Sequence, residues 1–237
     1  MDRYFVLLGG GELKTKETLA LDRAIGDLAK ARAGAEKRAN ALFVGTASHD
    51  FMPYYNTFHK TYTGELGLKT DVALTVYTEM NAEKLDAKFE KADLIYVGGG
   101  DTVFLLDHWK RTGLGERILD AYRRGVIVAG LSAGAICWFE RMYTDSAKAD
   151  GSGEAPYAVY PALGVLPGGA CPHYDHRRAD FAVAAPEGSK WVCMEDNAAV
   201  VWRNGELAGA LKNGGNAYTV SKIDGKIEEI PIPEIAL

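Results

Sequence analysis

A buried strand that runs directly into a Gly-x-Ser-x-Gly turn is the feature that most constrains this chain. Residues 126–129, Val-Ile-Val-Ala, form a continuous apolar run, which is typical of a strand buried on both faces. Gly130-Leu131-Ser132-Ala133-Gly134 follows at once, and an apolar helical pattern begins after it. This order predicts a serine at the tip of a sharp turn, with its hydroxyl exposed. Close backbone packing is expected at Gly130 and Gly134, because a Cβ atom there would clash.

The same turn indicates a nucleophilic serine with oxyanion donors beside it. The N–H of Ala133 lies at the predicted helix start, where it could stabilise a developing oxyanion. Gly99-Gly100 closes the preceding strand, which we expect beside the Ser132 strand, so the N–H of Gly100 is predicted as the second donor. The alternative interpretation is that these small residues only let a helix pack closely on a sheet.

Apolar strands alternate with helical patterns through the first part of the chain, which predicts a parallel sheet with helices on both faces. The loops that follow the strands should gather at one edge, where such sheets bind ligands. We expect Gly9–Gly11, the 45–53 loop, Gly98–Gly100 and Ser132 at that edge. The expected strands are 4–8, 41–44, 72–76, 93–97 and 126–129, and the expected helices are about 15–32, 81–91, 102–111 and 114–124.

Beyond about residue 143 the pattern changes. We expect a loop over 145–162, a short strand at 163–166 and a turn at 167–169. A helix over 177–185 and a strand over 190–194 should follow. Three Asn-Gly or Asp-Gly pairs after residue 198 separate short β-like runs, which predicts a C-terminal antiparallel meander at a sheet edge. The whole of 1–237 is expected to form one domain.

Composition excludes several classes of function. The formal charge of −5 argues against nucleic acid or an anionic membrane as the main partner. No run approaches the roughly 18 apolar residues of a membrane span, and the N-terminus lacks the pattern of a signal peptide. The three cysteines lack metal-ligand spacing, which favours a cytoplasmic protein without a metal site. Neither triple-glycine turn fits a dinucleotide or Walker pattern, so no cofactor is expected.

A nucleophilic serine requires a base, and the base requires an orienting acid. Of the five histidines, His173 and His176 follow a Gly-Gly turn and a proline, on a loop expected at the active edge. We favour His173, because Pro172 should hold its backbone extended, whereas His176 resembles the solvated start of a helix. A loop histidine satisfied only by backbone is the alternative.

Two neighbouring residues, Glu195 and Asp196, are the candidates for the orienting acid. Glu195 and Asp196 end a strand that points toward the active edge, so a carboxylate there could reach a loop imidazole. Neighbours in a strand point to opposite faces, so only one of the two should do so. Asp145 and Asp175 are alternatives that we expect to cap or line loops.

Four motifs together resemble peptidase family S51. They are YVGGGDT at 96–102, AGLSAGA at 129–135, PHYD at 172–175 and EDNAA at 195–199, and they span nearly the whole chain. That family contains dipeptidase E, the α-aspartyl dipeptidase, and is related to cyanophycinase. The resemblance implies a fold like that of class I glutamine amidotransferases, which is flavodoxin-like. It also implies a Ser-His-acid triad in which the acid comes last.

The sequence departs from the family pattern at two places. The family's glutamate falls at Asp196, with Glu195 beside it. The segment after His173 is shorter than in dipeptidase E and lacks the run that carries its arginine for an N-terminal aspartate. Arg177 or Arg178 could substitute for that arginine, and Asp101 of the first motif is a further substrate-binding candidate.

These observations predict a serine peptidase that cleaves short peptides through an acyl-enzyme. A homodimer is compatible with the sequence. An α/β-hydrolase esterase is one alternative, although no histidine lies beyond residue 176, where that class would place its base. A non-catalytic protein of the same fold that binds a small ligand is the other.

Overall fold

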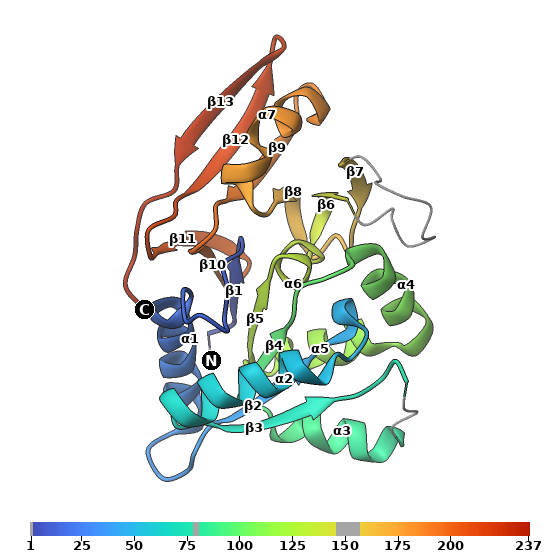
Figure 1. Ribbon diagram of the computed structural model, residues 1–237, viewed down its shortest axis with the longest axis vertical. Coiled ribbons are helices and arrows are strands. Elements are labelled where there is room, and N and C mark those ends of the chain that lie inside the picture. Colours follow the sequence, from blue (N-terminus) through green and yellow to red (C-terminus); the bar gives the residue numbers. More distant parts are fainter. Residues whose placement is uncertain (1, 78–80, 146–156) are drawn as a thin grey trace.

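A seven-stranded sheet forms the centre of the computed structural model, which describes residues 2–77, 81–145 and 157–237 (Figure 1). Its strand order is β11-β10-β1-β5-β4-β2-β3. Within this order β1, β5, β4, β2 and β3 are parallel to their neighbours. At the other edge β10 pairs antiparallel with β1, and β11 pairs antiparallel with β10. The bounds are β1 Tyr4–Leu8, β2 Asn40–Val44, β3 Lys69–Ala73, β4 Leu94–Val97, β5 Ile127–Leu131, β10 Ala198–Arg203 and β11 Glu206–Lys212.

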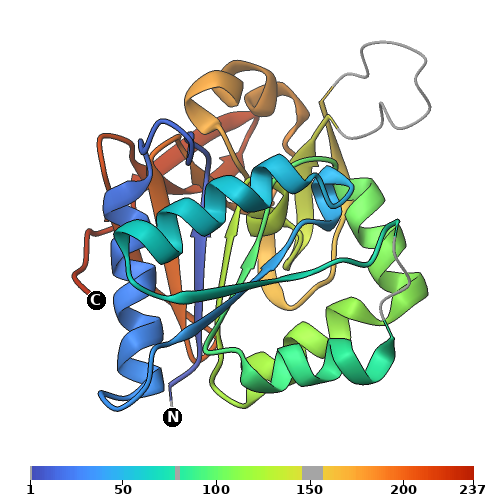
Figure 2. The same cartoon turned by 60° about the horizontal axis from the view of Figure 1, so that its bottom comes forward.

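Helices cover both faces of this sheet, as predicted (Figure 2). Alternation along β1 sends Phe5 and Leu7 into one apolar cluster and Val6 and Leu8 into another. The first cluster is closed by α3, α4 and α5, and the second by α1 and α2. The helix bounds are α1 Leu19–Ala33, α2 Met52–His59, α3 Ala82–Lys91, α4 Thr102–Thr112, α5 Leu114–Arg123, α6 Ala133–Ile136 and α7 Tyr174–Ala184, with a 3₁₀ turn at Thr46–Ser48 and a π-helical turn at Lys60–Glu65.

A second sheet of six strands, in the order β13-β12-β9-β8-β6-β7, continues from the first (upper part of Figure 1). Within it β6, β8 and β9 are parallel neighbours. One face carries Met142, Val192 and Met194 into the same apolar cluster as Phe5 and Leu7, so the two sheets share a core. The bounds are β6 Phe139–Thr144, β7 Ala158–Pro161, β8 Leu166–Cys171, β9 Lys190–Met194, β12 Ala217–Ile223 and β13 Lys226–Pro231.

No helix in the described part of the chain has the length and apolar character needed to cross a membrane.

The third predicted strand was placed too late in the chain. We expected 72–76, whereas β3 spans Lys69–Ala73 and pairs with β2 along its length. The Asp50 carboxylate accepts hydrogen bonds from the backbone N–H groups of Thr75 and Val76, at 2.6 and 2.7 Å. These contacts take both residues out of the sheet, so their β-branched side chains gave a misleading signal.

The structure also revises the region after residue 143. The predicted turn at 167–169 is part of β8, where Gly169 makes room for an aromatic side chain of β9. A Cβ atom on Gly169 would lie 2.2 Å from the Trp191 ring. Part of the expected 145–162 loop is β7, and residues 146–156 lie outside the described residues. Helix α7 begins at Tyr174, earlier than the predicted 177.

The C-terminal strands form antiparallel hairpins at sheet edges. They are shared between the two sheets: β10 and β11 extend the first, and β12 and β13 extend the second. The pairs Asn204-Gly205 and Asp224-Gly225 form the two tight turns, where both residues of each pair have positive φ.

Candidate active site

Ser132 lies at the carboxyl end of β5, at the sharp turn into α6. Its backbone has φ 51° and ψ −111°, a conformation that L-residues rarely adopt and that is typical of strained functional positions. The turn requires the flanking glycines. A Cβ on Gly130 would lie 2.1 Å from the Gly134 carbonyl oxygen, and one on Gly134 would lie 2.2 Å from that of Val97. The helix that follows is shorter than the pattern suggested, since α6 ends at Ile136.

His173 and Asp196 reach the same edge from β8 and β9. These parallel strands pair Cys171 with Cys193, so the chain leaves both at the same end of the sheet. His173 follows β8 after Pro172, and its backbone is left-handed, with φ 49° and ψ 42°, rather than extended as predicted. Asp196 follows β9 after Glu195. The His173 Nε2 lies 2.9 Å from the Ser132 Oγ, and its Nδ1 lies 2.6 Å from the Asp196 Oδ1. The serine hydroxyl, the imidazole and the carboxylate therefore form one hydrogen-bonded chain.

The carboxyl end of β1 holds these residues in register through backbone hydrogen bonds. The N–H of Ser132 donates to the carbonyl of Leu8 at 3.0 Å, and the N–H of His173 donates to that of Gly9 at 3.1 Å. Gly10 forms a parallel bridge with Asp196. Three side chains that are far apart in sequence are thus anchored to one short segment.

Gly10 is a site residue that sequence reasoning missed. A Cβ atom there would lie 1.9 Å from the Asp196 Oδ1 and 2.3 Å from the His173 Nδ1. The glycine therefore leaves room for the hydrogen bond between the imidazole and the carboxylate. A glycine run at the end of a predicted parallel strand was the available signal: it placed Gly9–Gly11 at this edge, but it did not indicate that Gly10 makes room for the contact between the imidazole and the carboxylate.

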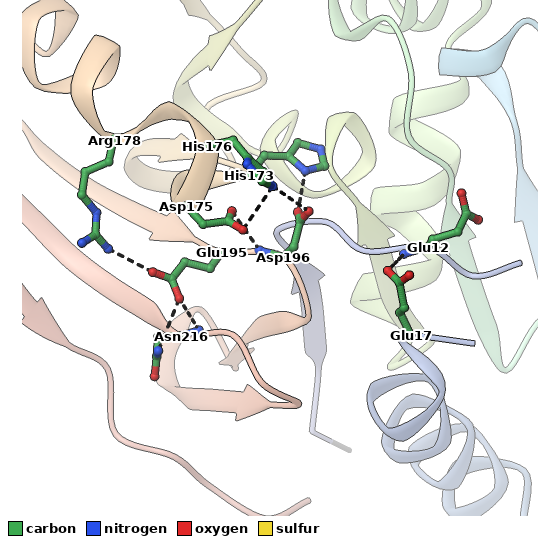
Figure 3. A network of polar contacts seen from close by, with 9 residues as sticks. All are labelled: Glu12, Glu17, His173, Asp175, His176, Arg178, Glu195, Asp196 and Asn216. Atoms are coloured by element: carbon green, nitrogen blue, oxygen red, sulfur yellow. Dashed lines mark hydrogen bonds and ion pairs between the residues drawn. The ribbon is translucent and has the colours of Figure 1, made fainter. Parts of the chain in front are cut away.

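Asp175 and His176, at the start of α7, contact the backbone N–H and the carboxylate of Asp196, respectively (Figure 3). The N–H of Asp196 donates to the Asp175 Oδ1 at 3.2 Å. The His176 Nε2 lies 3.5 Å from the Asp196 Oδ2 and 3.3 Å from the Asp175 Oδ2. The hydrogen bond from His173 is the main reason why the pKa of Asp196 is lowered, and the two imidazoles add attraction when charged. Asp196 is therefore held as a carboxylate.

Glu195 points to the opposite face and belongs to a different network (Figure 3). One carboxylate oxygen accepts from the backbone N–H of Asn216 at 2.8 Å and from its side-chain amide at 3.3 Å. The other accepts from Arg178 at 3.0 Å and from the Tyr218 hydroxyl at 3.4 Å. Strand alternation thus separates the two neighbouring carboxylates, and it is Asp196 that contacts the imidazole.

Of the two predicted oxyanion donors, Gly100 lies on the loop between β4 and α4, and Ala133 is the first residue of α6. A Cβ atom on Gly99, beside Gly100, would lie 3.4 Å from the Ser132 Cβ. The N–H of Gly99 donates to the Tyr54 hydroxyl at 3.2 Å, whereas within the described residues the N–H groups of Gly100 and Ala133 have no hydrogen-bond acceptor. Gly100 has φ 140°, and a Cβ there would lie 2.2 Å from the Ala47 carbonyl oxygen.

The three residues proposed for substrate contact have partners within the protein. Asp101 caps α4 and accepts from the N–H of Phe104 at 3.0 Å. The guanidinium carbon of Arg177 lies 4.5 Å from the centroid of the Tyr157 ring. Arg178 pairs with Glu195, as described above. Their contact with a substrate stays a prediction.

One group in the described chain has the geometry of metal ligands. Single ligand atoms of Asp175, His176 and Asp196 lie within 4.8 Å of one another. Asp175 and His176 are exposed, and Asp196 already accepts from His173. The expectation of a metal-independent site therefore stays a prediction.

Comparisons with known proteins identify the family. The model of peptidase family S51 matches residues 5–209. The chain belongs to peptidase family S51. Peptidase YgaJ of Bacillus subtilis (strain 168), an uncharacterized protein, is 33% identical over 241 residues, which cover 98% of each chain. Peptidase E of Streptomyces coelicolor is 32% identical over 128 residues, covering 52% of this chain and 50% of its own. The chain is thus a member of a peptidase family.

Solved structures confirm the fold class. A peptidase from an acI-B1 actinobacterium superposes with a TM-score of 0.75 at 16% identity, covering 100% of this chain and 98% of its own. A candidate peptidase E from Listeria monocytogenes EGD-e gives a TM-score of 0.61 at 21% identity, covering 87% of this chain and 97% of its own. The predicted α/β fold of the class I glutamine amidotransferase-like type is therefore confirmed.

Proposed function

We propose that this S51 family member is a serine peptidase that hydrolyses short peptides, with Ser132 as nucleophile. The observation that carries the proposal is the hydrogen-bonded chain in which His173 lies 2.9 Å from the Ser132 Oγ and 2.6 Å from the Asp196 Oδ1. Nucleophile, base and orienting acid within hydrogen-bond reach of one another are what acyl transfer by a serine requires.

In the proposed reaction, the Ser132 Oγ attacks the scissile carbonyl carbon while the His173 Nε2 accepts the hydroxyl proton. Asp196 fixes the tautomer that presents a bare Nε2 to the serine, and its charge stabilises the imidazolium that forms. His173 then donates the proton to the leaving amine, which leaves an acyl-enzyme on Ser132. A water molecule, deprotonated by His173, attacks that ester and releases the acid product and free Ser132.

The oxyanion of each tetrahedral intermediate would be held by the N–H groups of Gly100 and Ala133. Within the described residues neither N–H has an acceptor, so neither is already committed to a hydrogen bond in the protein. The contribution of Ala133 comes mainly from its own N–H, because α6 is too short for a large helix dipole. Loss of one such donor costs about 10²- to 10³-fold in kcat in other acyl-transfer enzymes.

The reaction is tested by comparing Ser132→Ala and His173→Ala with the parent chain on a dipeptide library. We expect both variants to fold and to lose roughly 10³-fold or more in kcat. His59→Ala is a matched control, because this histidine lies on α2 and contacts the Thr70 hydroxyl rather than Ser132. Near-normal turnover by Ser132→Ala would refute the serine mechanism.

The same measurements separate the alternatives. A member of the fold that binds a small ligand without turnover would hydrolyse neither peptides nor esters at a rate that depends on Ser132. An esterase would cleave aryl esters in a Ser132-dependent manner and leave every dipeptide intact. Family membership favours the peptide over the ester as substrate.

A further inference from the structure

One pocket of the described chain is lined by Leu131 and Gly11, the sequence neighbours of Ser132 and Gly10. It has a volume of about 380 Å³. Pockets that hold small ligands span roughly 300–1,000 Å³, so this one could take a single side chain with room for water. A larger cavity, about 620 Å³, is lined mainly by α4, α5 and the β6–β8 region, and none of its lining residues is a sequence neighbour of Gly10, Ser132, His173 or Asp196.

Two sequence adjacencies and one hydrogen bond place this pocket next to the catalytic chain. Leu131, in its wall, immediately precedes Ser132. Tyr54 accepts the hydrogen bond from Gly99, whose Cβ position lies 3.4 Å from the Ser132 Cβ. Gly11 follows Gly10, the residue that packs against His173 and Asp196. A peptide with its carbonyl carbon at the Ser132 Oγ would therefore have a neighbouring side chain within reach of this pocket.

Most of the pocket wall is apolar or aromatic. Leu131, Pro53 and Phe51 contribute hydrocarbon surface, and Phe51 is 59% exposed although it is a large aromatic residue. The Tyr54 ring is fixed, since it packs edge-on against Phe43 with centroids 5.0 Å apart. Its hydroxyl is occupied by the N–H of Gly99, and burial raises the pKa of Tyr54 to about 12, so it stays neutral. A rigid aromatic surface beside an exposed one favours an apolar occupant.

The two charged residues that line the pocket carry charges of opposite sign. Glu12 and Lys14 are both exposed, and the Glu12 Oε1 accepts from the backbone N–H of Lys14 at 2.8 Å. The Glu12 side chain extends away from Glu17, which accepts from the Glu12 N–H (Figure 3). One carboxylate and one ammonium leave no net positive charge to select an acidic side chain. The pocket therefore lacks the charge that an aspartyl-specific site would need.

We propose that this pocket binds a large apolar side chain, aromatic or branched aliphatic, of a residue flanking the scissile bond. This inference rests on the proposed function and adds its substrate class: short peptides with a bulky apolar residue rather than aspartyl peptides. Phe51 and Tyr54 would determine that specificity. An acidic preference that depends on Lys14 is the opposite outcome.

The proposal is tested with dipeptides in which Ala, Leu, Phe and Asp are placed in turn at each position. We expect kcat/KM to be at least about tenfold higher for Leu or Phe than for Ala at one position, as apolar pockets give in other enzymes. Phe51→Ala should reduce that ratio to within about threefold of unity, while Phe51→Tyr should retain it. Tyr77→Ala is the matched control, since this aromatic residue is 80% exposed and lies outside the pocket lining.

Failure of this inference can be told apart from failure of the proposed function. Ser132-dependent hydrolysis with equal rates for Ala and Phe, or a preference for Asp that Lys14→Ala abolishes, would overturn the pocket assignment and leave the serine mechanism standing. If no peptide is hydrolysed, calorimetry with Ser132→Ala protein decides the question. Binding of the Phe dipeptide about tenfold tighter than the Ala dipeptide, lost in Phe51→Ala, supports the pocket, and equal binding refutes it.

Discussion

Replacing Asp196 by asparagine should cripple turnover, whereas the matching change at Glu195 should not. The Asp196 Oδ1 lies 2.6 Å from the His173 Nδ1, so in the proposed mechanism the carboxylate would orient the ring and face the charge that develops on it. Two unit charges about 4 Å apart attract by about 4 kcal/mol at an effective dielectric constant of about 20, which corresponds to about 10³-fold in rate. An asparagine amide can also bond the wrong tautomer, and that effect can reach about 10⁴-fold.

Glu195→Gln removes one negative charge, as Asp196→Asn does, but at the neighbouring residue. Its carboxylate bonds Asn216 and Arg178 on the other face, at 2.8 and 3.0 Å. Weakening these contacts costs about 1–2 kcal/mol of folding stability. For a chain of this size, that lowers the midpoint of thermal unfolding by about 2–4 °C per kcal/mol. We expect kcat within about tenfold of the parent value.

The assay is steady-state hydrolysis of a dipeptide by both variants, with thermal unfolding measured alongside. The expected result is a loss of about 10³- to 10⁴-fold in kcat for Asp196→Asn and a small shift in stability for Glu195→Gln. The reverse pattern would transfer the orienting role to Glu195. A small loss of kcat in both variants would show that neither Glu195 nor Asp196 is the orienting acid and would leave Asp145 or Asp175 as the candidates.

Three further predictions follow from the geometry. Gly10→Ala should abolish activity, because its Cβ would lie 1.9 Å from the Asp196 Oδ1, and a folded variant with normal kcat would contradict this. Burial raises the pKa of Asp22 from 3.8 to about 6, so its contribution to stability is full below 3.8 and is lost as pH rises through 6, about 3 kcal/mol in all. Urea unfolding at several pH values should therefore show Asp22→Asn gaining stability relative to the parent chain between pH 4 and 7. Chelators should leave hydrolysis unchanged, and recovery of chelator-treated protein on adding zinc would contradict the metal-independent mechanism.

The parallel part of the fold could be predicted because its signals are local. Buried parallel strands are continuous apolar runs, and the Ser132 turn needs glycines at fixed spacing whatever surrounds it. The loops expected at one edge do meet there: Gly10 packs on Asp196, and the Asp101 N–H donates to the Ala47 carbonyl at 2.8 Å. The predicted position of the third strand was wrong, because a long-range contact from Asp50 ends β3 earlier than the residue composition suggested.

The second sheet was harder to predict because its pattern depends on distant partners. Gly168 and Gly169 are typical of a turn in isolation, and their place in a strand depends on β9: a Cβ atom on Gly169 would clash with the Trp191 ring and one on Gly168 with the Lys190 carbonyl oxygen. The position after the predicted 190–194 strand indicated Glu195 and Asp196 as candidates for the acid, alternation limited the role to one of them, and the family resemblance aligned it with Asp196. Residue patterns alone could not choose between the two, because the choice depends on the direction in which the chain leaves β9 toward His173.

Covalent trapping of Ser132 tests the central claim most directly. The parent chain is treated with a fluorophosphonate, and the intact mass and the modified peptide are determined by mass spectrometry. We predict one adduct per chain, on Ser132, with parallel loss of dipeptide hydrolysis and no adduct in Ser132→Ala or after unfolding. Full hydrolytic activity in a chain that takes up no fluorophosphonate, or an adduct on another residue that accounts for the inactivation, would contradict the serine mechanism.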